Sequence, residues 1–188
     1  ANAGTGRQGL VDAEAICRAL AERVGCWQEE VLPFSTGVIG EPLPLYRVVT
    51  GLPAALAALR PDGWSEAAHG IMTTDTRPKW ASRRLNLNGR DVTVTGIAKG
   101  AGMICPDMAT LLAFVATDAA VDEAVLRSAL TGAVAESFNA ITVDGDTSTN
   151  DSCLLLATGQ SGAKVSAEGE DYLRFADTVR AVCNDLAQ

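Results

Sequence analysis

The sequence predicts an α+β fold, in which mixed sheets with hairpins pack against helices. Two runs of alternating apolar residues flank Asn88-Gly89 between residues 84 and 100, which is the pattern of a β-hairpin with a tight turn. Segments with helical periodicity precede and follow this hairpin. Hairpins mixed with helices favour α+β over a doubly wound parallel sheet, because a parallel sheet requires regular alternation of strand and helix.

The first half of the chain alternates helices with irregular segments. Residues 10–25 place apolar side chains on one face of a helix, and residues 52–60 predict a short Ala/Leu helix that Pro61 ends. Residues 31–44 contain two glycines and three prolines, which indicates a loop or a short broken strand. Residues 70–80 predict a strand that runs out into polar residues.

The second half continues the mixture. An apolar run predicts a strand over 111–117, and Asp118 is placed to cap a helix over 119–138. Residues 140–159 predict a strand, a polar loop and a second strand, and residues 167–186 predict a final helix. The buried faces of the two helices are expected to comprise Val121, Val125 and Ala129 in the first, and Leu173, Ala176, Val179, Cys183 and Leu186 in the second.

The composition is that of a folded protein of one domain, or of part of a larger one. Of the 188 residues, 47% are hydrophobic and 20% are charged, which supports a real core and argues against disorder. The net charge is −8, and no run of lysine or arginine exceeds two residues. No nucleic-acid partner is therefore expected, since such binding rests on clustered cations. No apolar run reaches 18 residues, so no membrane span is expected either.

The cysteines and the N-terminus indicate a cytoplasmic protein. Five cysteines lie far apart without a Cys-x-x-Cys pair, and His69 is the only histidine, so a Cys/His zinc site lacks support. Most of these thiols are interpreted as small core residues in a reducing compartment. The opening ANAGTGRQG has no apolar signal-peptide region. It also lacks an initiator Met, from which we expect the chain to begin inside a longer product.

Thr110 is the candidate nucleophile. A serine-hydrolase triad lacks support, because no Gly-x-Ser-x-Gly elbow occurs and His69 is better interpreted as a surface or hydrogen-bonded histidine. A threonine made N-terminal by cleavage carries its own base, since its α-amino group has a reference pKa of about 7.7–8.0. Thr110 stands at the mouth of the strand 111–117. The alternative is an ordinary β-branched strand former.

Three other stretches offer polar groups for catalysis. Thr36 and Gly37, after Ser35, could form a two-donor oxyanion hole from a hydroxyl and a backbone N–H on a turn, or an ordinary turn. Lys99 could bind a substrate carboxylate, or be a solvated lysine at a strand end. The Thr-Thr-Asp-Thr stretch over 73–76 supplies hydroxyls and one carboxylate without a clear role.

The acidic loop over 143–151 is the remaining candidate, as the metal-binding loop of a metal-dependent enzyme. Asp144 and Asp146 have the alternate spacing of a calcium loop. However, Thr149 and Leu155 occupy the places of the glycine and the glutamate that such a loop requires. We therefore expect no metal site, and interpret the loop as a tight turn held by Asx and Ser/Thr side chains.

Four longer blocks decide between these alternatives. In order, they are STGVIGEPLP, IMTTDTRPK, KGAGMICPDMATLLAFVATDA and FNAITVDGDTSTNDSCLLLATG. Together they resemble the ornithine acetyltransferase (glutamate N-acetyltransferase) family of arginine biosynthesis, and the opening ANAGTG resembles that family's glycine loop. The resemblance covers essentially all of residues 1–188 and implies the fold of that family.

The resemblance implies a chain that cuts itself between Ala109 and Thr110. Residues 1–109 would then be part of a first subunit and residues 110–188 part of a second, with the subunits associated as a hetero-oligomer. Thr110 would be the nucleophile of the acetyl transfer.

The resemblance also assigns the other site residues. Thr36 and Gly37 match the oxyanion-hole pair, Lys99 matches a substrate-binding lysine, and Thr76 matches a substrate-binding threonine, with Thr74 as the nearby alternative. The implied reaction moves an acetyl group from N-acetylornithine to glutamate through acetyl-threonine, and acetyl-CoA is a further donor in some members. No cofactor is implied.

Two departures from the family pattern qualify these expectations. The family's Gly-Glu-Gly segment with its substrate-binding Glu, and its C-terminal Asn and Thr/Ser ligands, would come after Gln188. Asp107 stands where many relatives have Asn. The alternative is therefore a folded but catalytically incomplete fragment, or an interaction domain, of such an enzyme.

Overall fold

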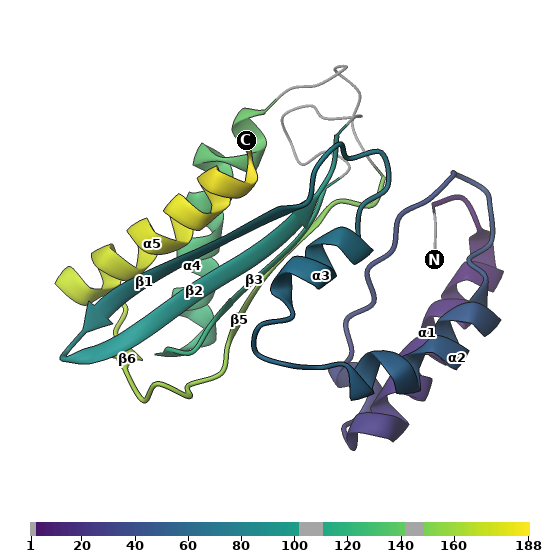
Figure 1. Ribbon diagram of the computed structural model, residues 1–188, viewed down its shortest axis with the longest axis horizontal. Coiled ribbons are helices and arrows are strands. Elements are labelled where there is room, and N and C mark those ends of the chain that lie inside the picture. The colour runs from purple at the N-terminus through teal and green to yellow at the C-terminus, as the bar shows by residue number, and fades with distance from the viewer. Residues whose placement is uncertain (1–2, 102–110, 142–148) are drawn as a thin grey trace. The chain divides into compact units, whose positions relative to one another are not determined.

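The computed structural model describes residues 3–101, 111–141 and 149–188 (Figure 1). The chain divides into two compact units, Ala1–Gly63 and Trp64–Gln188. Its helices are α1 (Gly6–Val24), α2 (Leu45–Ala57), α3 (Trp64–Gly70), α4 (Glu123–Glu136) and α5 (Glu170–Leu186), with short 3-10 turns η1 (Gln28–Glu30) and η2 (Phe138–Ala140). Its strands are β1 (Lys79–Leu87), β2 (Arg90–Lys99), β3 (Leu112–Thr117), β4 (Ala120–Val121), β5 (Ser152–Ala157) and β6 (Lys164–Val165). No helix within these described ranges is long and apolar enough to cross a membrane.

The first unit is helical, and α1 packs against α2 and η1. The helix predicted over 10–25 is confirmed as α1, which ends where Gly25 adopts a left-handed conformation with φ of 77°. The loop predicted over 31–44 is also confirmed, since this segment holds no regular element. The second helix was predicted at the wrong bounds, because α2 begins at Leu45 and ends at Ala57, before the predicted end at Pro61. Pro53 lies inside α2, where proline fits helical φ and costs one backbone hydrogen bond.

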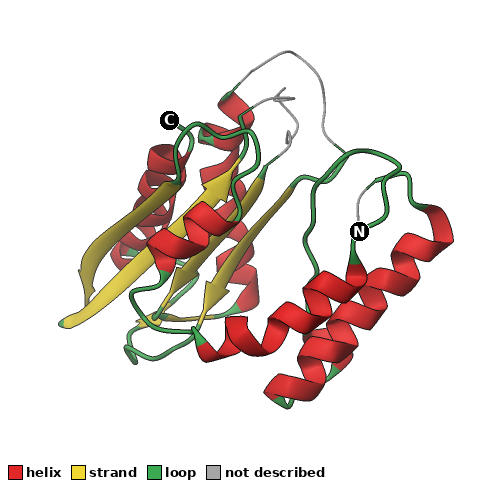
Figure 2. Cartoon of the chain, turned by 45° about the vertical axis from the view of Figure 1, so that its right-hand side comes forward, coloured by secondary structure: helices red, strands yellow, loops and turns green. Residues whose placement is uncertain are grey.

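The second unit is built on a mixed sheet with the strand order β1-β2-β3-β5. The pairs β1–β2 and β2–β3 are antiparallel, whereas β3 and β5 are parallel. A separate small sheet pairs β4 with β6 in parallel. Helices α4 and α5 pack on one another and α5 packs on β1 and β2, while α3 contacts β1 and β2 from the other face (Figure 2). This combination of hairpin, mixed sheet and flanking helices confirms the α+β prediction.

The hairpin is the element that the sequence predicted best. Asn88 and Gly89 join β1 to β2 with φ angles of 51° and 76°, which is the left-handed pair that a two-residue turn requires. The Asn86 side chain accepts a hydrogen bond from the Gly89 N–H at 3.0 Å. The first strand is longer than predicted, because it begins at Lys79.

The strand predicted over 70–80 is wrong. Helix α3 ends at Gly70, and residues 71–78 form turns before β1 begins. Pro78 has no N–H for a sheet ladder, and the Asp75 carboxylate accepts the Thr73 N–H at 3.3 Å, so local bonds replace strand pairing here. His69 is exposed in α3 and its Nδ1 lies 2.8 Å from the Ser65 carbonyl oxygen, which fits the interpretation of a surface histidine.

The start of the fourth helix was also misplaced. Asp118 does not cap it, because its carboxylate accepts the Thr93 N–H at 2.8 Å. The chain then forms β4, and α4 begins at Glu123 with Asp122 in the N-cap position. Of the three residues predicted to face inward, Val125 and Ala129 are buried and Val121 is partly buried.

The last helix and the second strand of 140–159 are confirmed as α5 and β5, with one correction in the helix. Leu173 is 61% exposed, and Phe175 and Val182 lie in the core instead. The first strand predicted in that region is wrong where it is described, since η2 occupies Phe138–Ala140. Its remainder, and the polar loop after it, fall largely on residues 142–148, which lie outside the described residues.

The core of the second unit forms where α5 meets the centre of the sheet. Val179, Val182 and Cys183 of α5 are fully buried, as are Val92 and Val94 of β2. Gly96 lies at their closest approach: a Cβ added there would lie 3.0 Å from Leu186, 3.1 Å from Val115 and 3.2 Å from Val182. Glycine at this position therefore sets how closely the helix approaches the sheet.

We predict that Gly96→Ala lowers the free energy of unfolding by about 1–3 kcal/mol, because the added methyl group overpacks the interface of α5 with the sheet. Gly132→Ala is the matched control. Nothing lies within 4 Å of a Cβ at Gly132, and α4 is continuous there. The control should gain about 0.5–1 kcal/mol from helix propensity alone. Urea denaturation of both variants tests this, and equal effects of the two substitutions would contradict it.

Candidate active site

The candidate site lies where β2 ends and β3 begins. Because these strands are antiparallel, Lys99 at the end of β2 pairs with Leu112 at the start of β3. Val92, Val94 and Ala98 belong to the core under α5. Side chains alternate along a strand, so Lys99 points to the opposite face, as Ile97 does. Residues 102–110 connect the two strands and lie outside the described residues, and they include Ala109 and Thr110.

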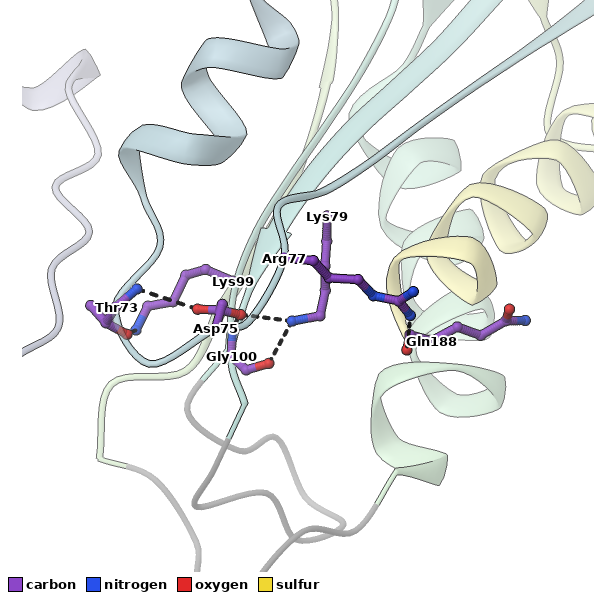
Figure 3. A network of polar contacts seen from close by, with 7 residues as sticks. All are labelled: Thr73, Asp75, Arg77, Lys79, Lys99, Gly100 and Gln188. Atoms are coloured by element: carbon purple, nitrogen blue, oxygen red, sulfur yellow. Dashed lines mark hydrogen bonds and ion pairs between the residues drawn. The ribbon is translucent and has the colours of Figure 1, made fainter.

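Lys99 is buried and is not the solvated strand-end lysine of the alternative prediction. It is 3% exposed, and its Nζ donates a hydrogen bond to the Thr73 hydroxyl at 3.1 Å (Figure 3). Burial lowers the pKa of its ammonium; the carboxylates of Asp75 and Asp151 oppose this shift, and the charge of Lys79 adds to it. A cation held with so little water interacts strongly with an anionic ligand.

The Asp75 carboxylate joins the segment before β1 to the residue after Lys99. Its side chain is 1% exposed, and it accepts hydrogen bonds from Lys79 Nζ at 2.6 Å, from the Gly100 N–H at 2.8 Å and from the Thr73 N–H. Burial by itself raises the pKa of Asp75, but these hydrogen bonds outweigh burial and hold the pKa below its usual value. Lys79 Nζ also donates to the Gly100 carbonyl oxygen at 2.8 Å.

A pocket of about 490 Å³ opens beside Lys79 and Gly100 of this network, and Lys99 is not among its lining residues. Its polar wall comes from the turn that leads into β1 and from the residues after β2, and its apolar wall from the residue before β3, from η2 with the residue after it, and from the C-terminal end of α5. The described lining residues are Thr76, Arg77, Lys79, Gly100, Ala101, Leu111, Phe138, Ile141, Leu186, Ala187 and Gln188. Of the two threonines expected to bind substrate, Thr76 is among these residues and Thr74 is not. A concave site with an apolar wall and a few polar groups is the usual form of a small-molecule site.

Leu111, the residue directly before β3, is anchored through both its backbone N–H and its backbone carbonyl oxygen. The Leu111 N–H donates to the Asp151 carboxylate at 2.8 Å, and the Leu111 carbonyl oxygen accepts the Ser152 N–H at 2.9 Å. Thr110 directly precedes Leu111 in the sequence. The residue directly after Thr110 is therefore held in place by the Asp151 carboxylate and by the first residue of β5.

Thr36 and Gly37 belong to the first unit. Thr36 is partly buried and Gly37 is exposed, and the β-turn of this segment follows the pair, closed by a hydrogen bond from the Glu41 N–H to the Val38 carbonyl at 3.1 Å. The expectation that Gly37 lies on the turn is therefore wrong by one position. Lys99 and Thr76 belong to the second unit.

Two further groups of side chains, the buried thiols and the possible metal ligands, were also candidates. Burial raises the pKa of the Cys153 and Cys183 thiols to about 12, so neither is an available nucleophile at neutral pH. Among the described residues, no group of three or more His, Cys, Asp or Glu side chains is placed to hold a metal ion. Asp144 and Asp146 of the predicted loop lie outside the described residues.

Sequence reasoning assigned no role to four residues of this site: Thr73, Asp75, Lys79 and Asp151. Thr73 and Asp75 lie in the 73–76 stretch, whose polar groups the sequence left ambiguous. One signal was available, since Asp75 and Lys79 are four residues apart with opposite charges, but that spacing indicates a pair only within a helix. Asp151 ends the acidic loop over 143–151, but the sequence did not indicate its contact with Leu111, because the two residues are forty positions apart.

The family model of the ArgJ family matches residues 1–188. The chain belongs to the ArgJ family. It is 57% identical over 189 residues to the arginine biosynthesis bifunctional protein ArgJ of Methylococcus capsulatus, covering 100% of this chain and 46% of that protein. The chain thus spans about half the length of this curated ArgJ relative. The crystal structure of the Bacillus halodurans arginine biosynthesis bifunctional protein ArgJ matches with 39% identity and a TM-score of 0.49, over 56% of this chain and 55% of that one.

We predict that Lys99→Met stabilises this ArgJ-family chain at pH 7 by about 1 kcal/mol, because a buried ammonium is replaced by an apolar side chain of similar length and Asp75 keeps Lys79. The folded-state pKa of Lys99 is lowered, so the unfolded chain binds more protons between that pKa and about 10.4. The parent's stability therefore rises with pH across this window, and the advantage of the variant shrinks.

Urea denaturation at a series of pH values measures this effect. Lys164→Met, at an exposed lysine in β6, is the control and should change stability by less than about 0.5 kcal/mol. A Lys99→Met protein less stable than the parent at pH 7 would show that the partners of the ammonium outweigh its burial.

Proposed function

We propose that this chain is part of an acetyltransferase of arginine biosynthesis that moves an acetyl group from N-acetylornithine to glutamate through an acetyl ester of Thr110. The observation that carries the proposal is the buried ammonium of Lys99, paired across the sheet with Leu112 two residues after Thr110. Membership of the ArgJ family supports the same reaction.

Both half-reactions balance with Thr110 as the acetyl carrier. The Thr110 hydroxyl oxygen attacks the acetyl carbonyl of N-acetylornithine, its proton passes to the α-amino group of the same residue, and the proton then goes to the leaving amine as the C–N bond breaks. The amine of glutamate next attacks the ester. That step forms N-acetylglutamate and returns the proton to the Thr110 oxygen.

The α-amino group of Thr110 becomes available through self-cleavage after Ala109, which leaves residues 1–109 and 110–188 in two associated subunits. The anchoring of Leu111 by Asp151 and Ser152 supports this role, because a catalytic group must be held by a rigid support. The Thr36 hydroxyl and the Gly37 N–H stabilise the oxyanion of each tetrahedral intermediate.

Lys99 binds the α-carboxylate of the amino-acid substrate in this proposal. N-acetylornithine and glutamate both carry that group, so one cation serves both half-reactions. The burial of Lys99 supports the role, because an ammonium removed from water gains more from an incoming carboxylate than an exposed one does. Thr76 contributes a hydroxyl from the wall of the adjoining pocket. The mechanism needs no metal or cofactor, acetyl-CoA enters only as an alternative acetyl donor, and the enzyme works in the cytoplasm.

One observation favours a second candidate, a folded but catalytically incomplete part of such an enzyme. The chain spans only 46% of the Methylococcus relative. An assay of acetyl transfer by the 188-residue chain separates the two candidates, because the incomplete part would fold and lack turnover. Assays with acetyl-CoA and with a chelator in parallel test the second donor and any metal dependence.

We predict that Thr110→Ala leaves the chain uncut and without acetyl transfer, because one hydroxyl serves both reactions. Thr110→Ser keeps a hydroxyl and should retain part of both activities. Denaturing electrophoresis with N-terminal sequencing gives the answer, with a second piece that begins TLLAF in the parent and a single unbroken chain in Thr110→Ala. Full acetyl transfer by Thr110→Ala would refute the nucleophile.

We predict that Thr36→Ala lowers the turnover number about 10²–10³-fold, the usual effect of removing one oxyanion-hole donor. Ground-state affinity and the fold should change little, because the interaction strengthens only as charge develops on the oxygen. Thr36→Ser should recover much of the loss. Steady-state kinetics of Thr36→Ala measures this effect. If the variant folds normally and its turnover number stays within about twofold of the parent's, the oxyanion donors lie elsewhere.

A further inference from the structure

Asp75 is the most enclosed carboxylate of the candidate site, and the proposed reaction does not use it. Its side chain is 1% exposed, yet it lies in a turn segment rather than in a helix or a strand. A carboxylate in such a place costs free energy unless several donors compensate it. Asp75 has such donors. They are the Thr73 N–H and Lys79 Nζ near the start of β1, and the Gly100 N–H directly after Lys99.

The contacts of Asp75 form a closed loop that includes Lys99 (Figure 3). Asp75 Oδ1 accepts the Gly100 N–H at 2.8 Å, which fixes the peptide group directly after Lys99. Asp75 Oδ2 accepts the Thr73 N–H at 3.3 Å, and the Thr73 hydroxyl in turn accepts the Lys99 ammonium at 3.1 Å. The backbone and the side-chain end of Lys99 are therefore both tied, directly or through Thr73, to one carboxylate.

Lys79 completes the charge balance without taking the place of Lys99. Its Nζ is bound to Asp75 Oδ1 at 2.6 Å and to the Gly100 carbonyl oxygen at 2.8 Å. The hydrogen bond of Lys99 among the described residues goes instead to a neutral hydroxyl. Lys79 thus neutralises the charge of Asp75 at close range. The Lys99 ammonium is bound to a neutral hydroxyl and can therefore also bind an anionic ligand.

We propose that Asp75 is a positioning residue of the amino-acid site, which orients Thr73 and Lys99 so that the Lys99 ammonium is held in place for a substrate carboxylate. The inference deepens the proposed function and rests on it for the identity of the ligand. Its structural part, the coupling of Asp75 to Lys99, stands on the geometry alone. The alternative is that the Asp75–Lys79 pair only closes the turn before β1, in which case removing the charge would alter stability and nothing else.

Titration of the lysines by carbon NMR separates these two roles. The chain has only three lysines, Lys79, Lys99 and Lys164, so ¹³Cε labelling gives three resolvable signals. The charged groups that act on Lys99 are Asp75, Asp151 and Lys79. In Asp75→Asn, which keeps an acceptor oxygen and removes the charge, the pKa of Lys99 should fall by about one unit. The ¹³Cε signal of the exposed Lys164 should titrate as it does in the parent.

Asp118→Asn is the matched control. Asp118 also accepts a backbone N–H at the edge of β2, from Thr93 at 2.8 Å, but it does not act on Lys99. The control should leave the Lys99 titration unchanged. Lys79→Met should shift the pKa of Lys99 in the opposite direction. It removes a neighbouring positive charge, so the pKa of Lys99 should rise. It also keeps the inference testable if Asp75→Asn does not fold.

Substrate binding gives the second measurement. Glutamate titrated onto the protein and followed on the Lys99 signal should bind about tenfold more weakly in Asp75→Asn than in the parent near pH 8, a loss of about 1.4 kcal/mol. Where turnover is measurable, the change should appear mainly in KM. As pH rises, binding should be lost earlier in Asp75→Asn, because its Lys99 ammonium deprotonates at a lower pH.

The outcomes distinguish this inference from the proposed function. If a folded Asp75→Asn protein keeps the parent's Lys99 titration and glutamate affinity while Lys99→Met loses that affinity, the positioning role is refuted and the proposed function stands. If Lys99→Met binds glutamate as the parent does, the carboxylate role of Lys99 fails, and with it the ligand part of the inference. A Lys99 pKa that falls in Asp75→Asn and in no control supports the coupling in either case.

Discussion

The burial of one ammonium at the end of a central strand is the constraint on which the candidate site depends. Lys99 is carried inward because β2 is paired on both sides, with β1 and with β3, and α3 contacts its outer face. An isolated charge in that place would be costly, so the surroundings supply the Thr73 hydroxyl and the charges of Asp75 and Asp151. The turn before β1 and the segment before β5 thus each place a carboxylate that opposes the lowering of the Lys99 pKa by burial.

The same interactions tie the site to the rest of the second unit. Asp151 acts on Lys99 and also accepts the Leu111 N–H, so one carboxylate affects both the cation and the residue after the proposed nucleophile. The core under α5 holds the other face of β2, where Gly96 lets the helix approach closely. Stability and chemistry are thereby divided between the two faces of one strand: apolar packing on one, and a compensated charge that is unfavourable for folding on the other.

Much of the fold followed from local pattern. The Asn88-Gly89 hairpin, α1, α5, β3 and β5 were predicted because turn chemistry and periodicity act over a few residues. The failures have the opposite character. Residues 70–80 were assigned to a strand from their apolar start, whereas Asp75 holds a turn there by accepting the N–H of nearby Thr73 and that of Gly100, which is distant in sequence. The cap at Asp118 failed because Thr93 of the neighbouring strand competes for that carboxylate.

The sequence by itself determined the family, through blocks long enough to be specific, and with it the expected roles of Thr110, Thr36, Gly37, Thr76 and Lys99. Only the tertiary structure decided that Lys99 is buried and that Asp75 and Thr73 surround it. The physical reason is that burial and charge compensation are properties of neighbours in space. A lysine followed by glycine has the same local sequence in water as in a core, and the pairing of β2 with its neighbours determines which of the two surrounds it.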